Sequence, residues 1–127
     1  MKKKIIIIFF VISNSCNQIS KDNIISSFRD FEYNYVYKKS LDGDSHNVIK
    51  FLKINNIYDA KGYDHGENLV SLIEILGDST FCAYVNRLKK EDLNNLNNYI
   101  GVTENIGSNP IKISSKFPLT YKALNKF

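Results

Sequence analysis

The sequence predicts a mainly α-helical protein: a small single-domain bundle of five or six short helices behind a cleaved signal peptide and a short tether. Three observations support this class. Apolar residues recur at helical spacing along most of residues 23–127. Capping and stop residues separate these apolar patterns. Only one buried-strand-like run, Ile5–Ile12, occurs, and a single strand cannot form a parallel sheet.

The first expected helix carries four apolar residues at helical spacing: Ile24, Phe28, Phe31 and Tyr35. We place its start near Asn23, with Ser20 or Asp22 as a cap, and its end near Val36. Residues 31–37 also alternate between aromatic or apolar and polar residues, which is the period of a strand. The helix is the preferred interpretation of this stretch, and the strand is the alternative.

A turn over residues 41–45 precedes the second expected helix, which runs from about His46 to Asn55. Asp44 or Ser45 can cap this helix. Its predicted buried residues are Val48, Phe51 and Leu52. Residues 56–66 contain two glycines and several polar side chains, so we expect a longer loop there.

The strongest helical pattern follows this loop and ends before Gly77. Its apolar face consists of Leu69, Val70, Leu72, Ile73 and Leu76. A fourth helix, capped by Asp78 or Ser79, is expected to bury Phe81, Tyr84, Val85 and Leu88. A fifth helix, ended by Gly101, is expected to bury Leu93, Leu96 and Ile100.

The C-terminal quarter is expected to be irregular over residues 102–115, where Asn109-Pro110 breaks any helix. Pro118 suits the first position of a short closing helix. That helix would present Leu119, Tyr121 and Leu124.

The first sixteen residues have the three parts of a secretory signal. Lys2, Lys3 and Lys4 form a cationic region, Ile5–Ile12 forms an apolar run, and small residues precede Cys16. Eight apolar residues span about 12 Å as a helix, far less than the ~30 Å hydrocarbon core of a bilayer. A permanent transmembrane helix is therefore not expected here.

The stretch Ser13-Asn14-Ser15-Cys16 resembles the lipobox of bacterial lipoproteins, in which a small residue precedes a cysteine. This resemblance implies that cleavage follows Ser15 and that Cys16 is the lipid attachment site. It divides the chain into a signal peptide (1–15), a lipidated cysteine with a flexible tether (16–22) and a small helical domain (23–127). Two alternatives remain, which are ordinary cleavage after Ser15 and a buried strand over Ile5–Ile12.

The resemblance also sets the expected location and charge of the working molecule. We expect the bacterial cell envelope, with the domain outside the cytoplasm. Asn17 differs from the Asp of an inner-membrane retention signal, which favours the outer membrane. Removal of residues 1–15 takes three lysines from the 17 basic residues and leaves 14 against 13 acidic ones. The mature chain is then nearly neutral and lacks a basic stripe, so we expect no nucleic-acid partner.

The titratable residues do not match a catalytic or metal motif. His46 and His65, each beside acidic residues, are interpreted as exposed loop histidines, and no metal or other cofactor is expected. Cys82 is interpreted as a buried, inert thiol, although a bridge to Cys16 is possible if Cys16 is not lipidated. The chain contains no G-x-S-x-G, H-E-x-x-H, C-x-x-C or phosphate loop, so an enzyme is not expected.

The aromatic cluster of residues 31–37 is the one candidate interaction face. Tyr33, Tyr35 and Tyr37 offer large amphipathic surfaces that can anchor a partner, although such residues more often pack in a core. We therefore expect a non-enzymatic, membrane-anchored envelope lipoprotein that binds another protein in an inhibitor, immunity or assembly-accessory role. The alternative is a lipid-anchored receptor for a small ligand, either a glycan fragment or a metal ion.

Overall fold

A computed structural model describes residues 21–106 and 111–127, with side chains over residues 29–105 and 111–127. The described residues form seven helices and contain no strand, which confirms the mainly α-helical class. The helices are α1 (Lys21–Leu41), α2 (Ser45–Leu52), α3 (Ala60–Leu76), α4 (Asp78–Val85), α5 (Lys90–Ile106), α6 (Ile113–Lys116) and α7 (Pro118–Leu124). Six of them correspond to predicted helices. The seventh, α6, is a single turn at the end of the stretch over residues 102–115 that was expected to be irregular.

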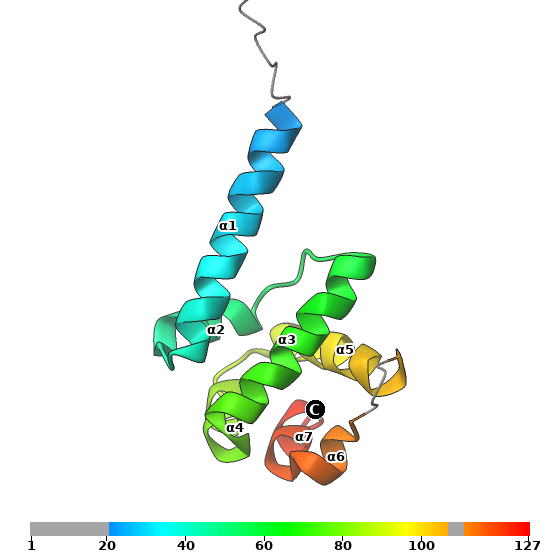
Figure 1. The fold of residues 1–127 in the computed structure, drawn as a ribbon. Coiled ribbons are helices and arrows are strands. Elements are labelled where there is room, and N and C mark those ends of the chain that lie inside the picture. Colours follow the sequence, from blue (N-terminus) through cyan, green and yellow to red (C-terminus); the bar gives the residue numbers. More distant parts are fainter. Residues whose placement is uncertain (1–20, 107–110) are drawn as a thin grey trace, which may run out of the picture.

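The longest element is α1, which projects from the other helices as an arm (Figure 1). It is helical throughout residues 31–37, so the strand alternative was wrong. Its C-terminal half packs mainly on α2 and to a smaller extent on α3. The helix begins at Lys21, within the predicted tether. Residues 16–20, and with them Ser15 and Cys16, lie outside the described residues.

The core lies between α3 and α5 and between α4 and α7, the two main contacts besides α1 with α2. Its largest fully buried apolar side chains are Phe51, Phe81, Leu52, Leu69, Leu72, Ile73, Leu93, Leu96, Ile100, Ile113 and Val48. The predicted buried residues of α2 are therefore confirmed, as are Leu69, Val70, Leu72 and Ile73 of α3, whereas Leu76 is only half-buried. Among the described residues, no helix is long and apolar enough to cross a membrane.

The loop predicted over residues 56–66 is shorter than expected, because α3 already begins at Ala60. Gly62 and Gly66, which suggested a loop, are both helical. Gly66 lies where α3 crosses α5: a Cβ there would overlap the carbonyl oxygen of Tyr99 and lie 2.8 Å from Cγ2 of Thr103. This glycine therefore allows a close helix crossing rather than a turn.

The predicted end of the fifth helix at Gly101 was wrong, since α5 continues to Ile106. A glycine ends a helix when it adopts a positive φ, as Gly77 does at +86° after α3. Gly101 is not among the glycines with positive φ. Asn109-Pro110, the predicted helix breaker, lies outside the described residues.

Asp78 or Ser79 was expected to cap the fourth helix, but α4 has no side-chain cap, and Asp78 caps α7 instead. Its Oδ2 accepts the backbone N–H of Leu119 at 2.9 Å, and its Oδ1 accepts that of Thr120 at 2.8 Å. Pro118 occupies the start of α7 as predicted. Leu124 is buried, whereas Leu119 and Tyr121 are exposed and Thr120 is buried in their place. The periodicity located α7 but not the face that it buries.

Candidate functional site

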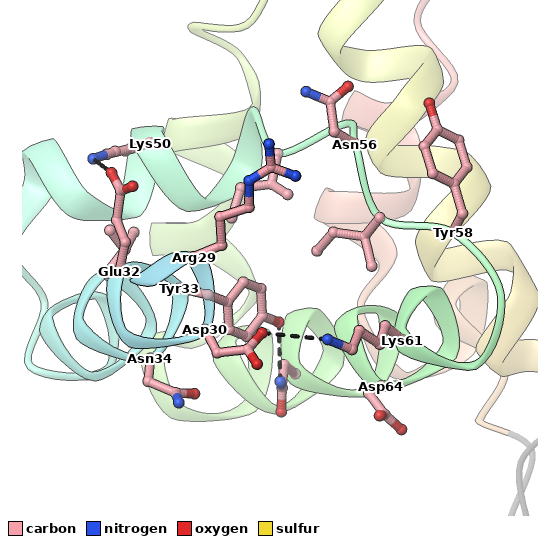
Figure 2. A pocket seen from close by; sticks show the side chains of 14 residues that line it. Arg29, Asp30, Glu32, Tyr33, Asn34, Lys50, Asn56, Tyr58, Lys61 and Asp64 are labelled. Carbon is pink, nitrogen blue, oxygen red and sulfur yellow. Dashed lines mark hydrogen bonds and ion pairs between the residues drawn. The ribbon is translucent and has the colours of Figure 1, made fainter. Parts of the chain in front are cut away.

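A groove of about 1350 Å³ lies between α1, α3 and the segment that joins α2 to α3 (Figure 2). We call it the α1–α3 groove. Its polar lining residues are Arg29, Asp30, Glu32, Asn34, Lys50, Asn56, Lys61, Asp64 and Asn68. Its tyrosine and aliphatic lining residues are Tyr33, Val36, Ile54, Ile57 and Tyr58. Nine of the fourteen lining residues therefore carry charged or amide groups, and the other five add tyrosine rings and aliphatic side chains.

Two ion pairs hold the arm to the neighbouring helices at the groove. Lys50 Nζ of α2 lies 2.6 Å from Glu32 Oε1, and Lys61 Nζ of α3 lies 3.3 Å from Asp30 Oδ1. All four side chains are about half exposed or more, so each pair stabilises the fold by less than about 1 kcal/mol. Their main effect is to place alternating charges along the groove (Figure 2).

Tyr33 lines the groove and also packs against the core, so it joins the two. The Tyr33 hydroxyl lies 2.9 Å from Nδ1 of His65, and it accepts a hydrogen bond from Nδ2 of Asn68 at 3.1 Å. Because Asn68 donates to the tyrosine oxygen, the hydroxyl proton can point to Nδ1, which places the imidazole proton on Nε2. Burial raises the pKa of the Tyr33 hydroxyl.

His65 was predicted to be an exposed loop residue, and this was wrong. It lies inside α3, is 1% exposed, and contacts the rings of Phe51 and Tyr99 with centroids 4.9 and 4.8 Å away. Its Nε2 is buried without a hydrogen-bond partner among the described residues. Desolvation lowers the pKa of His65 to about 4, so the imidazole is neutral at pH 7. The acidic neighbours Asp64 and Glu67 suggested an exposed loop, but they lie on the exposed side of α3 while His65 points into the core.

The wall of the groove opposite α1 is fixed by Tyr99 of α5. Its hydroxyl donates to the carbonyl of Ile57 at 3.0 Å and accepts the backbone N–H of the same residue at 3.2 Å. This double hydrogen bond ties the segment between α2 and α3 to α5. Spacing along the chain could not reveal it, since the two residues are 42 positions apart.

The three tyrosines of the predicted interaction face do not share one surface. Tyr33 and Tyr37 are half-buried on the side of α1 that faces the other helices, and their rings pack on Phe51 at 5.4 and 5.0 Å. Tyr35 is exposed on another side of α1. Only Tyr33 lines the α1–α3 groove.

The remaining candidates lie apart from the groove. His46 is exposed in the first turn of α2. Cys82 of α4 is half-buried rather than fully buried, and its sulfur accepts a hydrogen bond from Asn86 at 3.4 Å. Among the described residues, no three histidine, cysteine or acidic side chains are placed to hold a metal ion.

Comparisons of the chain with known protein families, with curated protein sequences and with solved structures find no match.

Proposed function

We propose that this chain is a bacterial envelope lipoprotein, anchored to a membrane through a lipid on Cys16, that binds a protein partner without catalysing a reaction. The anchor is supported by the sequence: the lysines at 2–4, the apolar run Ile5–Ile12 and the small residue Ser15 before Cys16. The domain would lie outside the cytoplasm, with the outer membrane preferred.

The observation that favours a protein partner is the form of the α1–α3 groove. Pockets for small molecules usually have volumes of ~300–1000 Å³ and are lined mainly by apolar side chains. This groove, at about 1350 Å³, is larger, and nine of its fourteen lining residues carry charged or amide groups. Three basic residues (Arg29, Lys50, Lys61) and three acidic ones (Asp30, Glu32, Asp64) line it. Such a surface complements a partner segment of mixed charge and discriminates against strongly acidic or basic ligands.

A receptor for a small ligand has less support. That alternative needs tyrosines that converge on one pocket or two histidines that can share a metal ion. Of the three tyrosines, only Tyr33 reaches the groove, and His65 is enclosed by aromatic rings.

The geometry of His65 also argues against acid–base catalysis in the groove. Its Nδ1 is engaged by the Tyr33 hydroxyl, and its Nε2 is buried, so neither nitrogen can exchange a proton with a bound molecule. The Tyr33 hydroxyl, with its raised pKa, stays protonated at neutral pH and cannot act as a base.

Photocrosslinking in cells tests the partner. A photoreactive p-benzoylphenylalanine in place of Asn56, exposed in the groove, is expected to give a discrete adduct with one protein. The same substitution at Asn94, exposed on α5 outside the groove, is the matched control and should give none. Lys61→Glu, which reverses a groove charge, should weaken the adduct, whereas Lys122→Glu on α7 should not. Equal adducts from both positions, or an adduct insensitive to Lys61→Glu, would argue against a partner in this groove.

A further inference from the structure

Helix α1 has apolar or aromatic residues on two opposite faces, and only one of these faces packs against the other helices. Val36 and Ser40 are buried and Tyr33 and Tyr37 half-buried against the other helices, whereas Phe31 is 70% and Tyr35 52% exposed. At 100° per residue, the mean direction of the exposed pair lies about 170° from that of the four packed residues. Helix α1, which projects as an arm in Figure 1, therefore carries Phe31 and Tyr35 on the side opposite its packed residues.

This face continues a regular pattern in the sequence. Ile24 and Phe28 stand at helical spacing before Phe31 and Tyr35, the arrangement that predicted a buried side of the helix. The structure describes the side chains of the last two, and both are exposed. A single exposed apolar residue needs no explanation, but a predicted core face that is left uncovered indicates a binding surface.

The charges around this face distinguish among possible occupants. The acidic side chains of α1 that the structure describes, Asp30 and Glu32, are paired with Lys61 and Lys50 at the groove. Lys38 and Lys39 are exposed near the C-terminal end of the aromatic face, and Lys39 Nζ lies 6.0 Å from the centre of the Tyr35 ring. Aromatic residues bordered by lysines are typical of helices that lie in the interface of an anionic membrane.

We propose that the Phe31–Tyr35 face of α1 lies on the surface of an anionic lipid bilayer, with Lys38 and Lys39 among the headgroups and the other helices on the far side of α1. This inference rests on the proposed lipid anchor. Only four residues, 17–20, lie between Cys16 and the start of α1 at Lys21, so the Cα atoms of Cys16 and Lys21 are at most about 17 Å apart in a fully extended chain. A helix about 31 Å long, tethered so closely, can lie along the membrane surface.

This orientation has a consequence for the proposed function. The residues that pack against the other helices point opposite to the aromatic face, so contact between that face and lipid directs the helical body away from the bilayer. The α1–α3 groove then stays open to the aqueous side, where a protein partner can reach it. The lipid alone would fix only the position of the chain terminus, whereas the aromatic face also fixes the orientation of the molecule.

Tryptophan fluorescence tests the inference cleanly, because the chain contains no tryptophan. Phe31→Trp and the control Leu119→Trp, which replaces an exposed apolar residue on α7, are purified from the membrane fraction. Each is reconstituted in phosphatidylglycerol vesicles with or without a dibrominated lipid that quenches nearby tryptophans. We expect at least about twofold quenching at position 31 and none at position 119. Replacing Lys38 and Lys39 with Glu in the Phe31→Trp chain should reduce the quenching.

Co-flotation of the chain with the vesicles is measured in the same samples, which separates the anchor from the face. A chain that floats but is not quenched at position 31, or is quenched equally at both positions, overturns the inference and leaves the anchor standing. If concentration-dependent crosslinking between copies accompanies the lack of quenching, a second copy of the chain covers the face instead. A chain that does not float overturns the anchor and, with it, this inference.

Discussion

Lowering the pH from 7 to 5 is expected to decrease the free energy of unfolding by about 2 kcal/mol through His65 alone. Burial lowers the pKa of this imidazole from 6.5 to about 4 in the folded chain. Between these two values the unfolded chain binds more protons than the folded chain, so acid favours unfolding. The contribution is fully present above pH 6.5 and is lost progressively as the pH falls to about 4, where the total loss reaches about 3 kcal/mol.

The structure explains the size of this effect. A protonated His65 would place a charge among Phe51, Tyr99 and Tyr33, and the hydroxyl of Tyr33 would have to turn so that its oxygen accepts the proton on Nδ1. The second N–H, on Nε2, would stay buried without an acceptor among the described residues. Neither change supplies a counter-charge to the imidazolium.

Urea unfolding followed by circular dichroism at a series of pH values measures the loss. His65→Gln removes the titrating group and should flatten the dependence between pH 7 and pH 5, although it lowers stability at neutral pH. His46→Gln, at the exposed histidine of α2, is the matched control and should leave the wild-type dependence in place. An NMR titration of the His65 ring that gave a pKa at or above 6.5 would refute this reasoning directly.

Two further predictions concern the fold. Gly66→Ala should decrease the free energy of unfolding by about 1–3 kcal/mol, because the new methyl group meets the backbone of Tyr99. Gly101→Ala, where nothing lies within 4 Å of an added Cβ, should increase it by up to about 1 kcal/mol, and a loss at both positions would contradict the described helix crossing. Asp78→Ala should cost about 0.5–2 kcal/mol because α7 loses its cap, while Asp78→Asn, which keeps one acceptor oxygen, should cost less. Urea unfolding measures both pairs, and equal losses for the two Asp78 variants would contradict the capping role.

Asp78 also illustrates how hydrogen bonds oppose burial. Desolvation alone would raise the pKa of its carboxyl group, but the hydrogen bonds from Leu119 and Thr120 outweigh it and lower the pKa. The cap is therefore expected to weaken in acid, as this carboxylate becomes protonated below its ordinary pKa.

The sequence predicted the helices well where the apolar spacing was long and a stop residue was unambiguous. The second half of α3, its end before Gly77 and the start of α7 at Pro118 all follow from local patterns. Glycines were misread at Gly66 and Gly101, because the meaning of a glycine depends on its φ and on what packs against it. Neither quantity is visible in one sequence.

The α1–α3 groove could not be predicted, because its parts are distant in the chain. Asp30 and Lys61 are 31 positions apart, and Tyr99 reaches Ile57 across 42 positions. The apolar spacing in α1 predicted a helix correctly, but it indicated that the side with Phe31 and Tyr35 would be buried. The residues of α1 that contact the core are instead Val36, Tyr33 and Tyr37. A helix with apolar residues on two sides can bury only one of them against a small body.

The intact mass of the protein from the membrane fraction tests the central proposal most directly. We expect a chain that lacks residues 1–15 and carries an added acyl mass on Cys16, and a Cys16→Ala chain that remains unprocessed and without lipid. A wild-type chain of full, unmodified mass, found in the cytosol, would contradict the lipoprotein assignment and the membrane orientation that depends on it.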